Sequence, residues 1–326
     1  MDELEFSTQE LSVAITNLPT RIGNPSDVSL FRNMPGTTSA FEVEFYAEDT
    51  VLVPTTAWGG VAPKNGSGTR TLETFAIPHM PLEDVVKAAD VMGVRAFGGT
   101  AAETVNGKVL DKLQIMKNKI DTTLAYRRTK AKQGIILDAD GTVIVNYNTR
   151  FGVAPQVVDF ELGTATTDVA AKCQDVIDQI EDGLGQETMS GIEVEVDRAF
   201  YDALVAHKNV REVFLNWSKG ADVLAAGNKS GFEFGGLKFI VNRQKIGGVP
   251  LIGVKEGHAY PLGTQDVFLN ALAPADFSDT VNTSALPYYA SQEPLKHNRG
   301  FELHVQSNQL PIVAKPKALV KVVSTK

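Results

Sequence analysis

The sequence has one cysteine among 326 residues, and this scarcity excludes two kinds of site. Cys173 has no partner for an intrachain disulfide, and a zinc site built from several cysteines cannot form. The histidines do not replace them, because no two stand at the spacing of a metal-binding helix or finger. We therefore expect no disulfide, no metal site and no cofactor. The histidines are His79, His207, His258, His297 and His304.

Long apolar runs and a large excess of one charge are also absent. No stretch is apolar enough to cross a bilayer, and Met1–Glu5 is acidic where a secretory signal is basic and then apolar. Charged residues make up 21% of the chain and the formal net charge is -8, which disfavours a dedicated nucleic-acid-binding protein. The 43% hydrophobic content can bury one large core or two smaller ones. These features predict a soluble protein made in the cytosol.

The first forty residues have few features of a compact domain. Proline and glycine interrupt every possible helix here, and we expect none. They occur in Asn17–Pro19, Gly23–Pro25 and Met34–Gly36. The segment is nevertheless more apolar than a solvated tail. Two interpretations are open: an extended arm that lies on a neighbouring surface, and a flexible leader. The apolar residues are Val13, Ile15, Leu18, Ile22, Leu30 and Phe31.

Two extended segments and a long loop follow. Alternation from Phe41 to Tyr46 predicts one strand, and the run Thr71–Ile77 predicts another. The loop between them ends in the glycine-rich polar stretch Lys64–Arg70. Loops of this length are usually functional. Trp58 lies near the loop tip and is either an interface anchor or a locally packed aromatic residue.

The most regular pattern predicts a helix from about Glu103 to Gln133. Apolar residues recur there at intervals of three and four, and a helix of this length extends roughly 45 Å. A shorter helix is expected at Leu82–Met92, ending at Gly93. The apolar stripe of the long helix consists of Val105, Val109, Leu113, Met116, Ile120 and Leu124.

The long helix is also basic. Eight Lys or Arg residues stand against three acidic residues, which gives a local net charge of +5. Two interpretations are open: a solvated face with partial ion pairing, and a surface that contacts the phosphates of packaged DNA. The basic residues are Lys108, Lys112, Lys117, Lys119, Arg127, Arg128, Lys130 and Lys132.

Asp138-Ala139-Asp140-Gly141 predicts the turn of a β-hairpin, because apolar runs flank it and Asp and Gly suit a type I turn with a bulge. The same residues match the first motif of haloacid-dehalogenase-type phosphatases, in which the first Asp attacks phosphorus beside Mg²⁺. The context favours the turn, since a long helix precedes the motif and a strand follows at once. Further helices are expected at 168–180, 197–207 and 210–224, and strands from Phe232 onward.

Five stretches, in this order, resemble the lambda-type major capsid protein E family of tailed bacteriophages. The similarity extends from about residue 15 to the end of the sequence, and the ordered set carries it, not any one motif. The stretches are Val94–Gly98 with Glu103-Thr104, Ile120–Gly134, Asp138–Gly141, Phe232–Gly236, and Ala273–Asp276 with Thr280–Thr283 and Pro287–Ala290.

The resemblance implies an α+β Hong Kong 97-type capsid fold and a structural, not enzymatic, function. The chain would be a major capsid protein that self-assembles into pentamers and hexamers of an icosahedral head enclosing the phage genome. An encapsulin-like nanocompartment shell is the alternative, and a magnesium phosphatase a remote one. The implied parts are an N-terminal arm (1–38), an E-loop with flanking strands (39–81), a P-domain with spine helix and hairpin (82–155 and 290–326) and an A-domain (156–289).

The resemblance also implies partners. These are other copies of the chain, a scaffold, a portal, a decoration protein and double-stranded DNA bound without sequence specificity, with assembly in the host cytoplasm, residence in the virion and no membrane. We expect Lys108, Lys112, Lys117 and Lys119 to face DNA in the lumen, and Trp58, Lys64, Arg70, Leu30 and Phe31 to lie between subunits.

Overall fold

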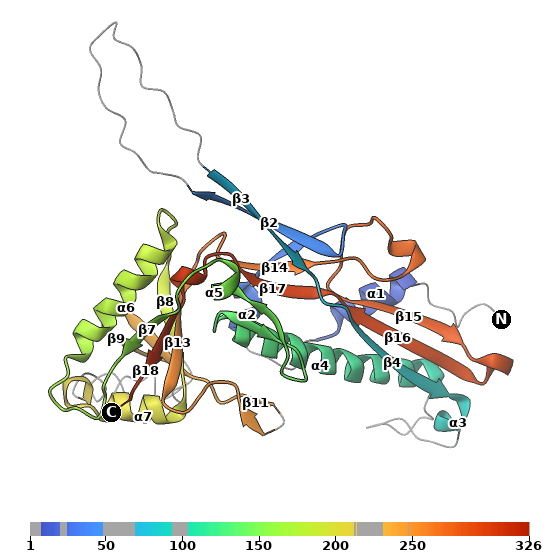
Figure 1. Ribbon diagram of the computed structural model, residues 1–326. Helices are drawn as coiled ribbons and strands as arrows, with labels where there is room; N and C mark the ends of the chain where they lie inside the picture. Colours follow the sequence, from blue (N-terminus) through green and yellow to red (C-terminus); the bar gives the residue numbers. More distant parts are fainter. Residues whose placement is uncertain are drawn as a thin grey trace, which may run out of the picture.

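The chain is an elongated α+β molecule with two lobes and a two-stranded ribbon that leaves the body (Figure 1). One lobe is built on a long helix and the other on a six-stranded sheet. Buried apolar side chains form two clusters, a larger one centred on the six-stranded sheet and a smaller one beside the long helix. The computed structural model describes residues 8–19, 25–47, 69–92, 104–211, 213, 231–246 and 248–325.

The long helix that the sequence predicts is α4 (Val105–Ala131), which we call the spine helix. Its apolar stripe, from Val109 to Leu124, is buried against a three-stranded antiparallel sheet of order β15-β16-β4. Thr104 caps its start by accepting a hydrogen bond from the Gly107 amide at 3.0 Å. Helix α1 packs on β15 and on α4. The other elements of this lobe are α1 (Thr8–Asn17), β4 (Met80–Lys87), α3 (Ala88–Val91), β15 (Tyr289–Pro294) and β16 (Gly300–Ser307).

The six-stranded sheet has the order β7-β18-β13-β8-β10-β9 and mixes parallel with antiparallel pairs. Helix α6, which the sequence predicts at 168–180, packs on this sheet through buried side chains that include Cys173 and Val176. Asp168 and Asp197 cap α6 and α7, as their side chains suggest. The elements are β7 (Gln156–Asp159), α6 (Val169–Leu184), β8 (Gly191–Val196), α7 (Arg198–Ala206), β9 (Phe232–Phe234), β10 (Leu237–Val241), β13 (Glu256–Leu262) and β18 (Val320–Val323).

A third sheet ties the N-terminal segment to the body. β1 (Arg32–Pro35) pairs in parallel with β14 (Phe268–Leu272), which pairs antiparallel with β17 (Gln309–Val313). Phe31 meets Phe268 edge to face, with ring centroids 5.3 Å apart. Because Phe31 is buried in this sheet's core, the segment belongs to the packing of its own chain.

Three two-stranded pairs complete the fold. The hairpin predicted around Asp138–Gly141 is confirmed: the Gly141 amide donates to the Asp138 carbonyl at 3.0 Å, and Gly141 has φ +87°. Among the helices of the described ranges, none is long and apolar enough to cross a membrane. The pairs are β2 (Ala40–Ala47) with β3 (Thr69–Ala76), β5 (Ile135–Leu137) with β6 (Val143–Asn146), and β11 (Lys245–Ile246) with β12 (Val249–Pro250); short helices are α2 (Pro25–Leu30), α5 (Tyr147–Arg150), η1 (Ser278–Thr280), η2 (Lys296–Asn298) and η3 (Pro316–Ala318).

The helix predicted at Leu82–Met92 is wrong over most of its length. Met80–Lys87 is strand β4, and all eight of its residues pair with β16. The adjacent valines Val85 and Val86 favour a strand, and the ladder to β16 outweighs the helix-favouring acids before them. Only Ala88–Val91 is helical. The helix predicted at 210–224 lies almost wholly outside the described residues.

The expectation of a helix-free N-terminal segment is also wrong. Leu11 and Ile15, four residues apart, are buried in the apolar cluster beside α4 and attach α1 to it. Pro19 follows the end of α1 and Pro25 begins α2, positions at which proline is compatible with helices. The prolines therefore delimit two short helices and do not prevent them.

Candidate assembly surfaces and charge clusters

The β2–β3 ribbon projects away from the body of the molecule (Figure 1). Its strands pair from Ala40↔Ala76 to Ala47↔Thr69, and its root is fixed in the body by the buried side chains of Val43 and Phe75. Arg150 adds a hydrogen bond to Glu73 at 2.7 Å. Leu72, further along β3, is 47% exposed, so the ribbon presents apolar surface away from its own core.

The spine helix holds α1 through a buried lysine. The Lys117 ammonium donates to the carbonyls of Ile15, Thr16 and Leu18 at 3.0, 3.2 and 2.5 Å. These carbonyls lie at the C-terminal end of α1, where a positive charge is favourable. The Ile15 carbonyl also accepts from the Leu18 amide at 3.3 Å. Burial nevertheless lowers the pKa of Lys117, against the opposing charge of Asp121.

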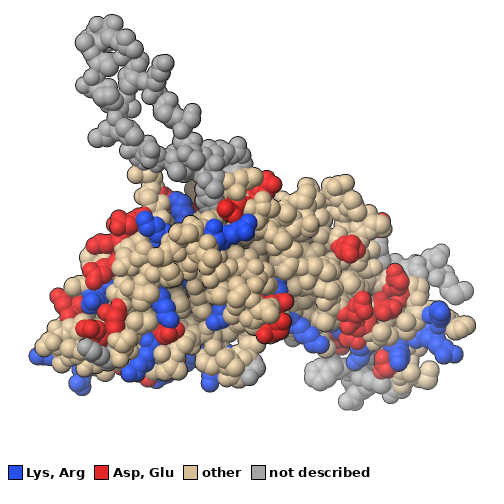
Figure 2. All heavy atoms as spheres, viewed as in Figure 1, with Lys and Arg blue, Asp and Glu red and all other residues tan. Residues whose placement is uncertain are grey.

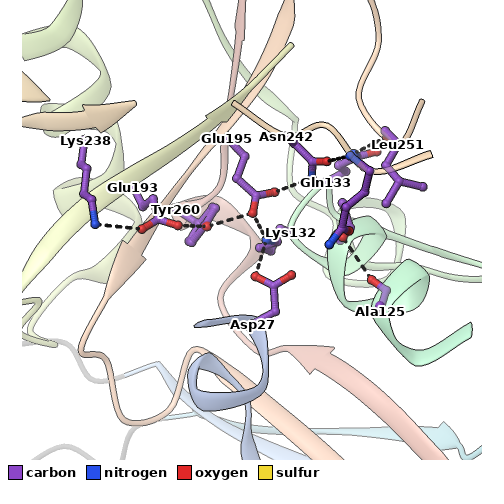
Figure 3. Close-up of polar contacts among 12 residues, drawn as sticks. Asp27, Ala125, Lys132, Gln133, Glu193, Glu195, Lys238, Asn242, Leu251 and Tyr260 are labelled. Carbon is purple, nitrogen blue, oxygen red and sulfur yellow. Dashed lines mark hydrogen bonds and ion pairs between the residues drawn. The ribbon is translucent and has the colours of Figure 1, made fainter. Parts of the chain in front are cut away.

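The spine helix holds α2 through a second buried lysine, which directly follows α4. The Lys132 ammonium lies 2.8 Å from Asp27 Oδ1 and 2.6 Å from Glu195 Oε1 (Figure 3). Asp27 comes from α2 and Glu195 from β8, so one cation joins the N-terminal segment, the spine helix and the six-stranded sheet. All three side chains are at most 5% exposed.

The cluster continues into the sheet. The Tyr260 hydroxyl lies 2.6 Å from Glu193 Oε1 and 3.4 Å from Glu195 Oε1, and Lys238 lies 3.8 Å from Glu193 Oε2 (Figure 3). Burial and the two glutamates raise the pKa of Tyr260, so its hydroxyl keeps its proton as a donor. We call the set of Asp27, Lys132, Glu193, Glu195, Tyr260 and Lys238 the junction cluster.

Burial sets the electrostatics of the junction cluster. It raises the pKa of Asp27, with Glu195 and Glu193 adding to the rise and Lys132 opposing it. For Lys132, burial disfavours the charge, but Glu195 and Asp27 outweigh burial and raise the pKa of the ammonium. The lysine is therefore firmly charged, whereas the ionised form of Asp27 is disfavoured.

Most of the basic residues of the spine helix are engaged within the chain. Lys112 binds Asp84 at 2.6 Å, Arg127 binds Asp138 at 2.9 Å, and Lys130 donates to the Leu251 carbonyl at 3.1 Å. Figure 2 shows acidic and basic side chains interspersed over both lobes on the face in view.

Fewer of the lysines expected to face the lumen are therefore accessible than the sequence suggested. Lys117 is buried and cannot contact DNA from the folded chain, so this part of the prediction is wrong. The Lys112 side chain is mostly buried and tied to Asp84. Lys108 is half-buried and Lys119 is exposed. Of the four lysines that we expected at the lumen, only these two keep the accessibility that the prediction needs.

The residues predicted between subunits fall into three groups. Phe31 is buried in the core of its own chain, and Leu30 is half-buried and packs partly against the same core, so the position of Leu30 between subunits stays a prediction. Arg70 lies in the β3 backbone opposite Tyr46. Trp58 and Lys64 lie outside the described residues.

The residues that suggested chemistry have structural roles here. Asp138 turns the β5–β6 hairpin and pairs with Arg127, and the Asp140 carboxylate accepts from the Thr142 amide at 2.9 Å. Cys173 is buried, and burial raises the pKa of its thiol to about 12. Among the described residues, no group of three or more His, Cys, Asp or Glu side chains could hold a metal ion.

The fold defines a class of protein. A putative prophage capsid protein from Escherichia coli CFT073 superposes with a TM-score of 0.57 at 13% identity, covering 98% of this chain and 99% of that one. The mature capsid of bacteriophage PhiM1 gives 0.56 at 13% identity, over 94% of this chain and 89% of that one. The chain therefore has the Hong Kong 97-type capsid fold that the sequence predicts.

The family follows from the sequence itself. The phage major capsid protein E family model matches residues 7–324, and the chain belongs to this family. The major capsid protein of Salmonella phage Felix O1 is 25% identical over 98% of this chain and 97% of that protein. The function is that of a phage capsid subunit, and the encapsulin-like alternative is weaker because the family and its relatives are phage capsid proteins.

Proposed function

We propose that copies of this chain associate into pentamers and hexamers that close into an icosahedral shell around a double-stranded DNA genome. The observation that carries this proposal is the β2–β3 ribbon, which projects from the body beyond a root held by the buried side chains of Val43 and Phe75. Exposed strand edges and apolar side chains such as Leu72 gain from pairing with another chain. Repeated contacts of this kind, many per subunit, stabilise closed assemblies.

Negative-stain electron microscopy of the purified protein, alone and expressed with its neighbouring genes, tests the proposal. Shells, tubes or capsomer rings are the expected result. In Leu72→Glu, a charge on the ribbon should block assembly while the circular dichroism spectrum stays that of the folded chain. Val249→Glu is the matched control, since Val249 is 66% exposed on the β11–β12 pair. Normal particles from Leu72→Glu would contradict the role of the ribbon.

The division into an arm (1–38), E-loop (39–81), P-domain (82–155 and 290–326) and A-domain (156–289) belongs to this proposal. Two apolar clusters and the long helix that anchors one of them support a division into two lobes. They do not follow the bound at 290–326, because β18 (Val320–Val323) pairs with β7 and β13 in the six-stranded sheet. Scaffold, portal and decoration proteins would bind the assembled shell, which would form in the host cytoplasm and reside in the virion.

DNA contact rests on Lys108 and Lys119, the two expected lumenal lysines that are not tied into the core. A Lys108→Gln/Lys119→Gln variant should form shells that hold less DNA, with the deficit shrinking as ionic strength rises, because salt weakens the phosphate contacts of the natural chain more than those of the variant. DNA content per particle, measured by absorbance ratio, reports this. Unchanged content at every salt concentration would remove DNA contact from the proposal.

The chain acts without catalysis in this proposal. Supporting this, Asp138 sits in a hairpin turn and is paired with Arg127, not at the end of a buried parallel strand. Phosphate release from a phosphomonoester in the presence of Mg²⁺ should be the same for the natural chain and Asp138→Asn. A magnesium-dependent rate lost in that variant would restore the phosphatase hypothesis.

A further inference from the structure

The junction cluster contains more buried negative charge than buried positive charge. Asp27, Glu193 and Glu195 are 3–4% exposed, and Lys132, 1% exposed, is the fully buried cation among them (Figure 3). Lys238 approaches Glu193 only to 3.8 Å and its side chain is 37% exposed. Three carboxylates that compete for one buried ammonium cannot all ionise without a large cost. The arrangement favours a state in which the carboxylates retain a proton.

The other charged groups that face the cluster do not titrate between about pH 5 and pH 9. His258 on β13 has its pKa lowered to about 3 by burial and by the charges of Lys321, Lys130 and Lys132, so it stays neutral. The neighbouring cation from α4, Arg128, belongs to a residue type that stays charged throughout this range.

Two groups within the cluster, Tyr260 on β13 and Lys132 directly after α4, also keep their protons in this range. The pKa of Tyr260 is raised from its ordinary value near 10, and that of Lys132 is raised as well. The proton must therefore reside on a carboxylate.

Asp27 differs from the two glutamates in its place in the fold. Glu193 and Glu195 lie on β8, in the interior of the six-stranded sheet, and stay there when the N-terminal segment moves. Asp27 lies on the six-residue helix α2, which lies outside that sheet, and α2 touches α4. When α2 separates from the junction, Asp27 returns to water, where a carboxyl of this type releases its proton at about pH 4.

We propose that docking of α2 onto the junction cluster takes up a proton from solvent, so that the N-terminal segment is held more tightly as pH falls. The direction follows from linkage, because burial raises the pKa of Asp27 in the docked state above its value in water. Between these two values the docked state binds more protons, and docking strengthens as pH falls. With one proton involved, the docking equilibrium changes by at most about tenfold per pH unit.

Hydrogen exchange of the amides of residues 26–31, measured by mass spectrometry on the full chain from pH 5 to pH 9, tests the proposal. After correction for the intrinsic exchange rate, protection should increase as pH falls, by up to about tenfold per unit where the cluster titrates. In Asp27→Asn, which keeps the shape but cannot titrate, protection should be independent of pH.

Asp84→Asn is the matched control, because it neutralises the aspartate of another lysine pair on the spine helix, that of Lys112. It should keep the natural pH profile at α2. A flat profile in the natural chain, or an unchanged slope in Asp27→Asn, would overturn the proposal. If Asp27→Asn does not fold, Glu193→Gln replaces it. Removing that charge should move the midpoint to lower pH, and an unmoved midpoint would equally overturn the coupling.

Discussion

The two buried lysines at the spine helix, Lys117 and Lys132, repeat one arrangement with different partners. Each ammonium lies 4.8 Å from the centre of a tyrosine ring, that of Tyr288 and that of Tyr260. Each tyrosine hydroxyl lies within hydrogen-bond distance of a carboxylate, Asp121 and Glu193 respectively. Each lysine also holds a helix of the N-terminal segment.

The difference lies in what the lysines bind. Lys117 binds three backbone carbonyls at the end of α1, whereas Lys132 binds the carboxylates of Asp27 and Glu195. The first attachment requires α1 to be helical, because only then do the three carbonyls converge. The second requires only that Asp27 reach the junction. The comparison shows two ways in which a buried lysine can attach a segment. Its binding can depend on the backbone conformation of the segment, or on a single side chain that the segment carries.

The largest expected effect is that of Lys132→Met. It leaves Asp27 and Glu195 buried without a cation, and breaking a buried ion pair in this way costs about 3–5 kcal/mol. The free energy of unfolding from urea titration measures it. Lys112→Met is the control, because that lysine pairs with the partly exposed Asp84 and should cost about 1 kcal/mol or less. Equal costs for the two variants would show that burial does not control the pair.

Lys117→Met should cost less, about 1–3 kcal/mol, because it strands neutral carbonyls and not carboxylates. Its effect should also be local. Amide exchange in residues 12–18 should accelerate, while residues 26–31 keep their protection. If Lys117→Met destabilises the chain more than Lys132→Met, or loosens α2 as much as α1, the distinction between the two anchors fails.

The smallest expected effect is a difference between Lys117 and Lys132 in how the free energy of unfolding depends on alkaline pH. The pKa of Lys117 is lowered in the folded chain, so between that value and about 10.5 the unfolded chain binds more protons and the natural chain gains stability as pH rises. The pKa of Lys132 is raised, so its contribution persists to about pH 10.5 and is lost above it.

The penalty of Lys117→Met should therefore grow from pH 8 to pH 10, by at most about 1.4 kcal/mol per unit, while that of Lys132→Met stays level. Urea titrations of both variants and the natural chain across this range supply the comparison. Parallel penalties would mean that the two ammonium groups have the same environment.

Local patterns predicted the elements that depend on local spacing. The spine helix and the Asp138–Gly141 hairpin follow from intervals of three and four and from turn chemistry, and both are present. β4 was misassigned because its strand identity comes from pairing with β16, more than 200 residues away in the sequence (Val86↔Phe301). Such pairing is invisible to a local pattern.

The junction cluster was missed for a related reason. The number of basic residues suggested that the spine helix has a basic surface, but their helical spacing already indicated that one of them is buried. Lys117 stands four residues after Leu113 and three before Ile120, which places it on the apolar stripe. Glu193 and Glu195 stand in the strand Gly191–Val196 between apolar residues, on one side of a strand that is buried on both faces. The other members of the cluster, Asp27, Lys132 and Tyr260, are distant from them in sequence and could not be placed beside them from spacing.

The parallel pairing of β1 with β14 has a consequence for how the chain is made. Asn33 and Asn270 meet across this pair, 237 residues apart in the sequence. A ribosome adding about 5–20 residues per second needs on the order of 10–50 s to make that interval. During this time β1 has no partner strand. The segment translated first is thus among the last to dock, and a nascent chain cannot present its finished surface until β14 has emerged.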